Sequence, residues 1–200
     1  MDQQTLKREY RFEGRGLHTG KYAHLKLCPA PENYGIRFFR RDVGQEIPAI
    51  APKVTRTDRS TTISDNGVSV VTIEHLLSAL TGLGVDNARI LLDNEEVPIL
   101  DGSAETYVRA IAPDGLQVQN AERKYIEIKE TVEVRDEQTG SWVRIEPADR
   151  MSFDVTVDFN SRVLGVQTAH WSENSDYVGQ VAPCRTFCFF HELEALAAHG

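Results

Sequence analysis

The chain has 200 residues, of which 40% are hydrophobic and 26% charged, and a formal net charge of −8. This composition is typical of a globular protein, and the acidic balance argues against binding along a nucleic-acid backbone. No apolar run is long enough for a transmembrane segment, and the first residues show no apolar secretory signal. The three cysteines form no even disulfide framework, so we expect reduced thiols and a cytoplasmic protein.

The first third of the chain predicts strands joined by turns. Alternation of apolar and polar residues favours strands in "YRFEG", "YAHLKLCPA" and "GIRFFRRD". Asp65-Asn66-Gly67 lies between segments rich in β-branched residues and indicates a hairpin.

The segment "VTIEHLLSALTGLG" predicts an amphipathic helix over 72–82. Its apolar residues recur at i, i+3, i+4 and i+7, and they are Ile73, Leu76, Leu77 and Leu80. We expect Thr72 as the N-cap and Gly82 or Gly84 as the stop. A buried strand, "NARILLD", follows. A second helix then begins after "PILDGSA", with Ser103 as its expected N-cap.

A domain boundary is predicted near residue 120, where the polar stretch "QVQNAERK" interrupts the pattern. Residues 1–120 form a first α+β domain that carries the helix with Glu74. Residues 121–200 are interpreted as the beginning of a second α+β domain that is truncated here. Strands are expected there in "YIEIKETVEVRD", "WVRIEPA" and "MSFDVTVDF".

Two segments resemble each other. "LKLCPAPENYGIRF" and "VRIEPADRMSFDV" are each an alternating strand, then Pro-Ala, then another strand, and they follow Thr19-Gly20 and Thr139-Gly140. One interpretation is a fold of two related halves, each a small, mostly antiparallel sheet layered on helices, with the second half incomplete. The other is chance similarity between two hairpins.

Glu74 and His75 lie side by side in the first turn of the first predicted helix. The simpler interpretation is a solvated turn, because an acidic residue is favoured at the positive end of the helix dipole. The alternative is a metal ligand beside a general base, as zinc hydrolases require. Ala79 stands where a His-Glu-x-x-His-type helix would carry a ligand, so further ligands must come from elsewhere.

Three blocks resemble one bacterial enzyme family, and they occur in that family's order. They are "GRGLHTGK" with "LCPAPENYGIRF", then "TIEHLLSALTGLGVDNARILLDNEEVPILDGSA", then "APCRTFCFFHELEAL". The chain is identified from them as a member of the UDP-3-O-acyl-N-acetylglucosamine deacetylase (LpxC) family. The resemblance implies a Zn²⁺-dependent amide hydrolase. Its substrate would be a small molecule, a UDP-acyl-amino sugar of lipid A biosynthesis in Gram-negative bacteria, from which it removes acetate.

Carried over residue by residue, the resemblance implies that His75 is a zinc ligand. It implies that Glu74 is the general base that takes a proton from zinc-bound water. Thr186, in "CRTF", resembles the family threonine that helps stabilise the oxyanion. The joint presence of these three residues favours an enzyme over the alternative, a non-catalytic binding or regulatory module that retains the fold.

Three further residues resemble positions at the family's substrate site. Leu17 and Phe187 match positions that line the site near the sugar or the start of the acyl chain. His18 lies close to the site in the family. The turn Asp101-Gly102-Ser103 resembles a turn that supports the site without a chemical role.

The chain departs from the family pattern near its end. The family completes its zinc site with a later His-Lys-x-x-Asp segment, and none of the six histidines here is followed by aspartate at the fourth position. The resemblance therefore implies that the remaining ligands lie beyond residue 200, and that these 200 residues alone are inactive. In some relatives the deacetylase is fused to a dehydratase domain.

Two other acidic or thiol-rich features are open to interpretation. Cys184, Cys188 and His191 have a spacing that could ligate a structural zinc, but we favour buried thiols because free cysteine behaves as a small hydrophobic residue. The family usually has glycine where Cys188 stands. The acidic stretch "DNEEVP" is interpreted as a solvated loop.

Overall fold

The computed structural model describes residues 1–189, and the chain divides into two compact units. Unit 1 comprises Met1–Arg123 together with the described residues from Tyr177 onward, and unit 2 is Lys124–Asp176. This division differs from the predicted one because the chain returns to unit 1 at Tyr177 instead of continuing the second domain.

A five-stranded sheet forms the centre of unit 1. Its order is β2-β3-β9-β4-β5; the pair β4–β9 is parallel and the other three neighbouring pairs are antiparallel. The strands are β2 (Tyr10–Arg15), β3 (Tyr22–Pro29), β4 (Ile36–Arg40), β5 (Gln45–Pro48) and β9 (Ala88–Leu92). The predictions of strands in "YRFEG", "YAHLKLCPA", "GIRFFRRD" and "NARILLD" are confirmed.

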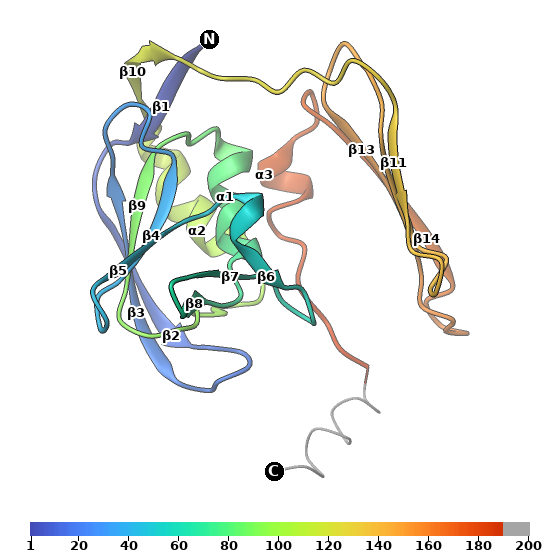
Figure 1. The fold of residues 1–200 in the computed structure, drawn as a ribbon, viewed down its shortest axis with the longest axis horizontal. Coiled ribbons are helices and arrows are strands. Elements are labelled where there is room, and N and C mark those ends of the chain that lie inside the picture. Colours follow the sequence, from blue (N-terminus) through green and yellow to red (C-terminus); the bar gives the residue numbers. More distant parts are fainter. Residues whose placement is uncertain (190–200) are drawn as a thin grey trace. The chain divides into compact units, whose positions relative to one another are not determined.

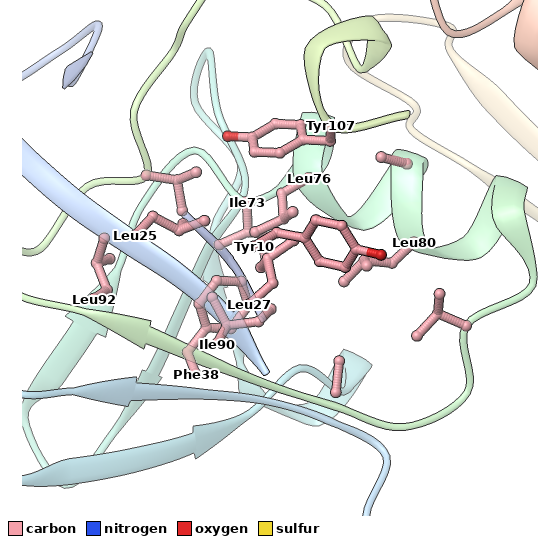
Figure 2. Packing of buried hydrophobic residues seen from close by; sticks show 14 of the residues in the cluster. Tyr10, Leu25, Leu27, Phe38, Ile73, Leu76, Leu80, Ile90, Leu92 and Tyr107 are labelled. Atoms are coloured by element: carbon pink, nitrogen blue, oxygen red, sulfur yellow. The ribbon is translucent and has the colours of Figure 1, made fainter. Parts of the chain in front are cut away.

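Helices α1 (Glu74–Leu83) and α2 (Glu105–Ile111) pack on one face of this sheet (Figure 1). The buried side chains that join the two layers include Tyr10, Leu25, Leu27, Phe38, Ile73, Leu76, Leu80, Ile90, Leu92 and Tyr107 (Figure 2). Burial of each such side chain contributes about 1.5–3 kcal/mol. Helix α1, which carries Glu74 and His75, is therefore firmly anchored through its apolar side.

The ends of the helices differ in part from the expectation. Gly84 terminates α1 in the left-handed conformation, with φ +85°, and donates its N–H to the carbonyl oxygens of Leu80 and Thr81, so the expected stop is confirmed. The expected N-cap is wrong, because the Thr72 hydroxyl bonds to a distant carboxylate and Ile73 occupies the cap position without a side-chain bond.

Ser103 performs the predicted capping chemistry one residue earlier than the formal cap of α2. Ala104 is the cap residue, but the Ser103 hydroxyl oxygen accepts the N–H of Glu105 at 3.0 Å. The start of α2 is therefore fixed by a local side chain, unlike the start of α1.

A three-stranded meander follows β5 and precedes α1. It contains β6 (Val54–Arg56), β7 (Thr62–Asp65) and β8 (Val68–Val70), and η1 (Ala51–Lys53) leads into it. The predicted hairpin turn is confirmed between β7 and β8, where Asn66 and Gly67 both have positive φ, 49° and 78°.

The sequence pattern did not predict the pairing of β1 (Asp2–Leu6) with β10 (Leu116–Glu122), which follows η2 (Ala112–Asp114). Both strands are rich in polar residues, and a glutamine from each strand bonds to the same third residue. The Asn87 side-chain amide donates to Gln3 Oε1 and to Gln119 Oε1, each at 2.8 Å. A polar stretch that we interpreted as an interruption is therefore an ordered strand.

Unit 2 consists of two antiparallel hairpins. Strand β11 (Val132–Arg135) pairs with β12 (Trp142–Ile145), and β13 (Ser152–Asp158) pairs with β14 (Val166–Ser172). The sheets of the chain are thus small and mostly antiparallel, and the α+β class is confirmed. The interpretation of two related halves stays a prediction.

The chain re-enters unit 1 through the short helix α3 (Tyr177–Gln180). The hydroxyl of Tyr177 lies 2.7 Å from the Ser78 hydroxyl on α1, and a Cβ atom at Gly82 would collide with the Tyr177 ring. The carbonyl of Ala182 then accepts the N–H of Ala104 at 3.1 Å. No helix within residues 1–189 is long and apolar enough to cross a membrane.

Candidate functional site

The two residues at the start of α1 face each other and are open to solvent. The His75 Nε2 atom lies 4.0 Å from Glu74 Oε1, and the side chains are 21% and 38% exposed, respectively. The other carboxylate oxygen of Glu74 accepts the N–H of Thr61 at 2.9 Å. A backbone donor therefore fixes one oxygen of the carboxylate while the other faces the imidazole.

Leu17 and His18 lie on the turn between β2 and β3. The turn is closed by the N–H of Gly16, which donates to the Lys21 carbonyl at 2.9 Å, and by the N–H of Gly20, which donates to the Gly16 carbonyl at 3.2 Å. Both predicted substrate residues are exposed, Leu17 by 52%. Their positions depend on what holds this turn.

The turn is held by Glu96, which the sequence interpretation missed. Its carboxylate accepts the N–H of His18 at 2.9 Å, the N–H and the hydroxyl of Thr19 at 2.7 Å each, and the hydroxyl of Thr72 at 2.9 Å. The interpretation of "DNEEVP" as a solvated loop is wrong for this residue, because Glu96 is only 1% exposed.

Burial and hydrogen bonding act on Glu96 in opposite directions. Burial alone raises the pKa of the Glu96 carboxyl, but the donors from His18, Thr19 and Thr72 together lower it below its ordinary value. A buried carboxylate with this many donors stays ionised and binds protons poorly. Glu96 is therefore suited to hold backbone and hydroxyl donors in place, and poorly suited to accept a proton during a reaction.

The residue that leads into α1 has an unusual backbone conformation. Thr72 has φ +59°, which is a genuine outlier for a β-branched residue. The neighbouring Val71 is paired on both sides, since its N–H donates to the Glu95 carbonyl at 2.9 Å and its carbonyl accepts the N–H of Val97 at 3.1 Å. Such strain persists only where the surroundings fix it, and here the bonds to Val71 and the Thr72 hydroxyl do so.

The segment 95–104 also contacts the other predicted site residues. The N–H of Ile99 donates to the Arg15 carbonyl at 3.0 Å, directly before the turn that carries Leu17. The carbonyl of Gly102 accepts the N–H of Thr186 at 2.8 Å. One segment therefore connects the turn after β2, the start of α1 and the irregular stretch around Thr186.

Gly102 is in close contact with Thr186. Gly102 has φ +79°, and a Cβ atom built there would lie 3.2 Å from Thr186 Cγ2. The turn is stabilised by Asp101, whose carboxylate accepts the hydroxyls of Ser103 and Thr106. Burial raises the pKa of Asp101, but these bonds lower it below its ordinary value. Thr186 and Phe187 are exposed, Phe187 by 57%.

The structure thus brings some predicted residues together and leaves others apart. Glu74 and His75 are adjacent, and the backbone of His18 shares a carboxylate with the residue that precedes α1 by two positions. Within residues 1–189, no hydrogen bond joins Thr186 to Glu74 or to His75. The link between them runs through the segment 95–104.

The cysteine prediction is wrong. Cys184 and Cys188 are exposed, because residues 184–188 are not helical and none of them is buried. His191, the third member of the alternative zinc group, lies outside the described residues. The described part of the chain therefore gives neither thiol a buried structural role.

The described residues fit a zinc centre only in part. A catalytic zinc uses three protein ligands and a water molecule. No group of three His, Cys, Asp or Glu side chains in residues 1–189 is placed to hold a metal ion. His75, beside a carboxylate, fits one ligand and one base, and the described residues do not complete the set.

Comparison with known proteins decides the family. The model of the family "UDP-3-O-acyl N-acetylglycosamine deacetylase" (LpxC) matches residues 3–200. The chain belongs to this family. It is 40% identical, over its whole length, to the UDP-3-O-acyl-N-acetylglucosamine deacetylase of a Nitratiruptor species. It is also 45% identical, over 97% of its length, to the bifunctional enzyme LpxC/FabZ of Porphyromonas gingivalis.

The chain spans only part of these members of the deacetylase family. It covers 67% of the Nitratiruptor protein and 42% of the Porphyromonas protein. A second bifunctional relative, from Bacteroides thetaiotaomicron, is 41% identical and is covered over 44% of its length.

Proposed function

We propose that this chain carries the general base, the first zinc ligand and part of the substrate site of a UDP-3-O-acyl-N-acetylglucosamine deacetylase that acts in the cytoplasm. The observation that carries the proposal is the pairing of Glu74 with His75 at a solvent-accessible helix start. Membership of the deacetylase family supports it. A surface turn that served only folding would need neither the adjacent imidazole nor the backbone bond that orients the carboxylate.

Glu74 acts as the general base. The N–H of Thr61 bonds to its Oε2 atom and so orients the carboxylate, and Oε1 is the oxygen available to accept a proton from water. General-base catalysis by a positioned carboxylate contributes about 10²–10⁴-fold to a rate. Helix α1, anchored by its buried side chains, keeps this geometry during turnover.

His75 would hold Zn²⁺ together with ligands supplied by protein beyond residue 200. When bound, such an ion lowers the pKa of a coordinated water to about 7 and polarises the amide carbonyl. The chain's own contribution is to present a half-buried imidazole whose position is fixed by the first turn of α1.

The exposed residues on the turn 16–21 and in the stretch around Thr186 contact the substrate. Thr186 donates its hydroxyl to the oxygen on which negative charge develops, and the bond from its N–H to Gly102 fixes its backbone. Leu17 and Phe187 offer apolar surface to the sugar or to the start of the acyl chain, and His18 follows Leu17 on the same turn. Exposed apolar side chains of this kind are typical of binding surfaces.

The proposal is tested in the complete protein by two neighbouring alanine substitutions. Glu74→Ala should lower kcat by at least about 100-fold while the zinc content stays near that of the wild type, because the carboxylate acts on water. His75→Ala should lower the zinc content itself. Glu105→Ala is the matched control, since Glu105 is the first-turn acid of α2 and pairs with Arg109, and it should change neither quantity.

Two outcomes would count against these assignments. Loss of zinc from Glu74→Ala but not from His75→Ala would reverse the two roles. A normal kcat in both variants would remove both residues from the mechanism, and a wild type without any deacetylase activity would favour the non-catalytic binding module.

A further inference from the structure

Two turns in the chain share one hydrogen-bond pattern. In the turn 136–141 of unit 2, the N–H of Asp136 donates to the Ser141 carbonyl and the N–H of Gly140 donates to the Asp136 carbonyl, both at 2.8 Å. The turn 16–21 of unit 1 repeats these bonds at equivalent positions, from Gly16 to Lys21 and from Gly20 to Gly16.

In each turn a carboxylate accepts hydrogen bonds from the third and fourth residues. The two turns differ in where that carboxylate comes from. Asp136, the first residue of its own turn, accepts the N–H of Gln138 and the hydroxyl of Thr139, each at 2.8 Å. In the turn 16–21 the equivalent donors are the N–H of His18 and the hydroxyl of Thr19, and both bond to Glu96. One carboxylate is local and the other comes from a segment almost 80 positions away.

Gly16 makes room for the distant carboxylate. A Cβ atom at Gly16 would collide with the carboxylate of Glu96 and would also come within 2.8 Å of the hydroxyl oxygen of Thr19, which can rotate once Glu96 no longer holds it. Gly16 is not among the residues with positive φ, so its backbone could accommodate a side chain if the space were free. Glycine is therefore required at this position for the approach of Glu96 and not for its own conformation.

The distant carboxylate makes one contact that a local one could not make. Glu96 Oε1 accepts both the N–H of His18 and the hydroxyl of Thr72, each at 2.9 Å. Thr72 is the residue with φ +59°, and it lies two positions before Glu74 and three before His75. The turn and the helix start thus share one buried anion.

We propose that Glu96 is a positioning residue that couples the turn bearing Leu17 and His18 to the helix start bearing Glu74 and His75. Asp136 shows that a local acid can accept the equivalent donors of such a turn, so the turn alone does not require a distant acid, and the coupling supplies the reason for it. The inference rests on the proposed function for its effect on catalysis. It concerns how the base and the substrate residues are held relative to each other.

The first test replaces the distant carboxylate by a local one. In the complete enzyme, Glu96→Ala should lower kcat by about 10–100-fold, the loss expected when a catalytic group shifts by about 1 Å. The double variant Gly16→Asp/Glu96→Ala should rebuild the turn in the manner of Asp136, yet leave kcat low. Recovery of kcat to within about twofold of the wild type in the double variant would show that Glu96 serves only the turn.

The second test cuts the coupling and leaves the turn intact. Thr72→Val keeps the shape of the side chain but removes the hydroxyl, and kcat should again fall by about 10-fold or more. Glu95→Gln is the matched control, because Glu95 is the neighbouring acid with an exposed ion pair to Lys21, and kcat should stay within about twofold. A normal kcat in Thr72→Val would overturn the proposal.

A measurement that needs no catalysis separates this inference from the proposed function. Hydrogen exchange on the 200-residue chain should show that Glu96→Ala exposes the N–H of Thr19 and also speeds exchange at Ile73, directly after Thr72. Gly16→Asp/Glu96→Ala should restore protection at Thr19 only. If the wild-type enzyme deacetylates nothing, the proposed function fails, but this exchange pattern would still support the coupling. Protection restored at both Thr19 and Ile73 in the double variant would overturn the coupling.

Discussion

Glu74 and Glu96 are both carboxylates near the start of α1, and their surroundings give them different tasks. Glu96 is buried and accepts four hydrogen-bond donor groups from three residues, so its proton affinity is low and its oxygens are engaged. Glu74 is 38% exposed and accepts one backbone N–H. Only Glu74 therefore has an oxygen that water can approach, which is why we assign the proton transfer to it.

The role proposed for Thr186 predicts a change in kcat. In the complete enzyme Thr186→Val should reduce kcat by about 100-fold and change KM much less, because a donor to a developing oxyanion acts on the transition state. Thr186→Ser keeps the hydroxyl and should retain most of the activity. Steady-state kinetics measure both quantities, and an unchanged kcat in Thr186→Val would remove Thr186 from the mechanism.

The sequence pointed to some of these residues and not to others, for a physical reason. Glu74 and His75 are adjacent in the chain, so their pairing could be proposed without a fold. Glu96 could not be assigned in this way, because its donors come from residues 18, 19 and 72 and its burial depends on all of them. A local reading of an acidic stretch predicts solvation, and only the tertiary structure shows which of its carboxylates is enclosed.

At the scale of elements, Glu96 joins the turn 16–21 to Thr72, which precedes α1. This contact predicts that the free energy of unfolding decreases at acidic pH. The pKa of Glu96 is lower in the folded chain than its ordinary value of 4.5, so the unfolded state takes up the proton first as the pH falls. The stabilisation is therefore complete above about pH 5 and declines as the pH falls through the folded-state pKa.

Urea unfolding of the wild type and Glu96→Gln over this pH range measures the effect. The difference in unfolding free energy should be largest near neutral pH and should shrink below about pH 4.5. Glu95→Gln provides the control, since its exposed carboxylate is expected to contribute little. A difference that grows on acidification would contradict the assignment.

Elements were predictable where one face is apolar and unpredictable where polar groups satisfy one another. The alternation in β3 places Leu25 and Leu27 in the core, and the same alternation is legible in the sequence. Strands β1 and β10 lack this signal, because Gln3 and Gln119 bond to Asn87 in place of apolar packing. Helix α1 begins later than predicted for a similar reason, since the hydroxyl of Thr72 donates to Glu96 and does not cap the helix.

At the scale of the whole molecule, the limited ligand set predicts the behaviour of the 200-residue chain. It should bind less than one equivalent of zinc and show no useful deacetylase activity, because a catalytic zinc needs three protein ligands and His75 is the one ligand that we propose among residues 1–189. Metal analysis and an assay, run beside a version extended through the parent reading frame, test this. Stoichiometric zinc with full activity in the short chain would show that the ligands lie within it, and Cys184, Cys188 and His191 would be examined first.

The expected solubility also differs between the units. Residues 1–125 should be well behaved, whereas unit 2 exposes many apolar side chains of its hairpins, including Val134, Trp142, Val143, Phe153, Val155 and Val166. The sequence interpretation had assigned Thr186 to this second part. The bond from its N–H to Gly102 instead assigns it to unit 1.

The return of the chain to unit 1 at Tyr177 has a consequence for biosynthesis. Strand β1 must wait for β10 before it can pair, and the stretch around Thr186 reaches Gly102 only after all of unit 2 has been translated. At about 5–20 residues per second, Lys124–Asp176 takes about 3–10 s to synthesise. A nascent chain on the ribosome therefore has time to form the sheet, α1 and the Glu74–His75 pair before it receives the segment bearing Thr186.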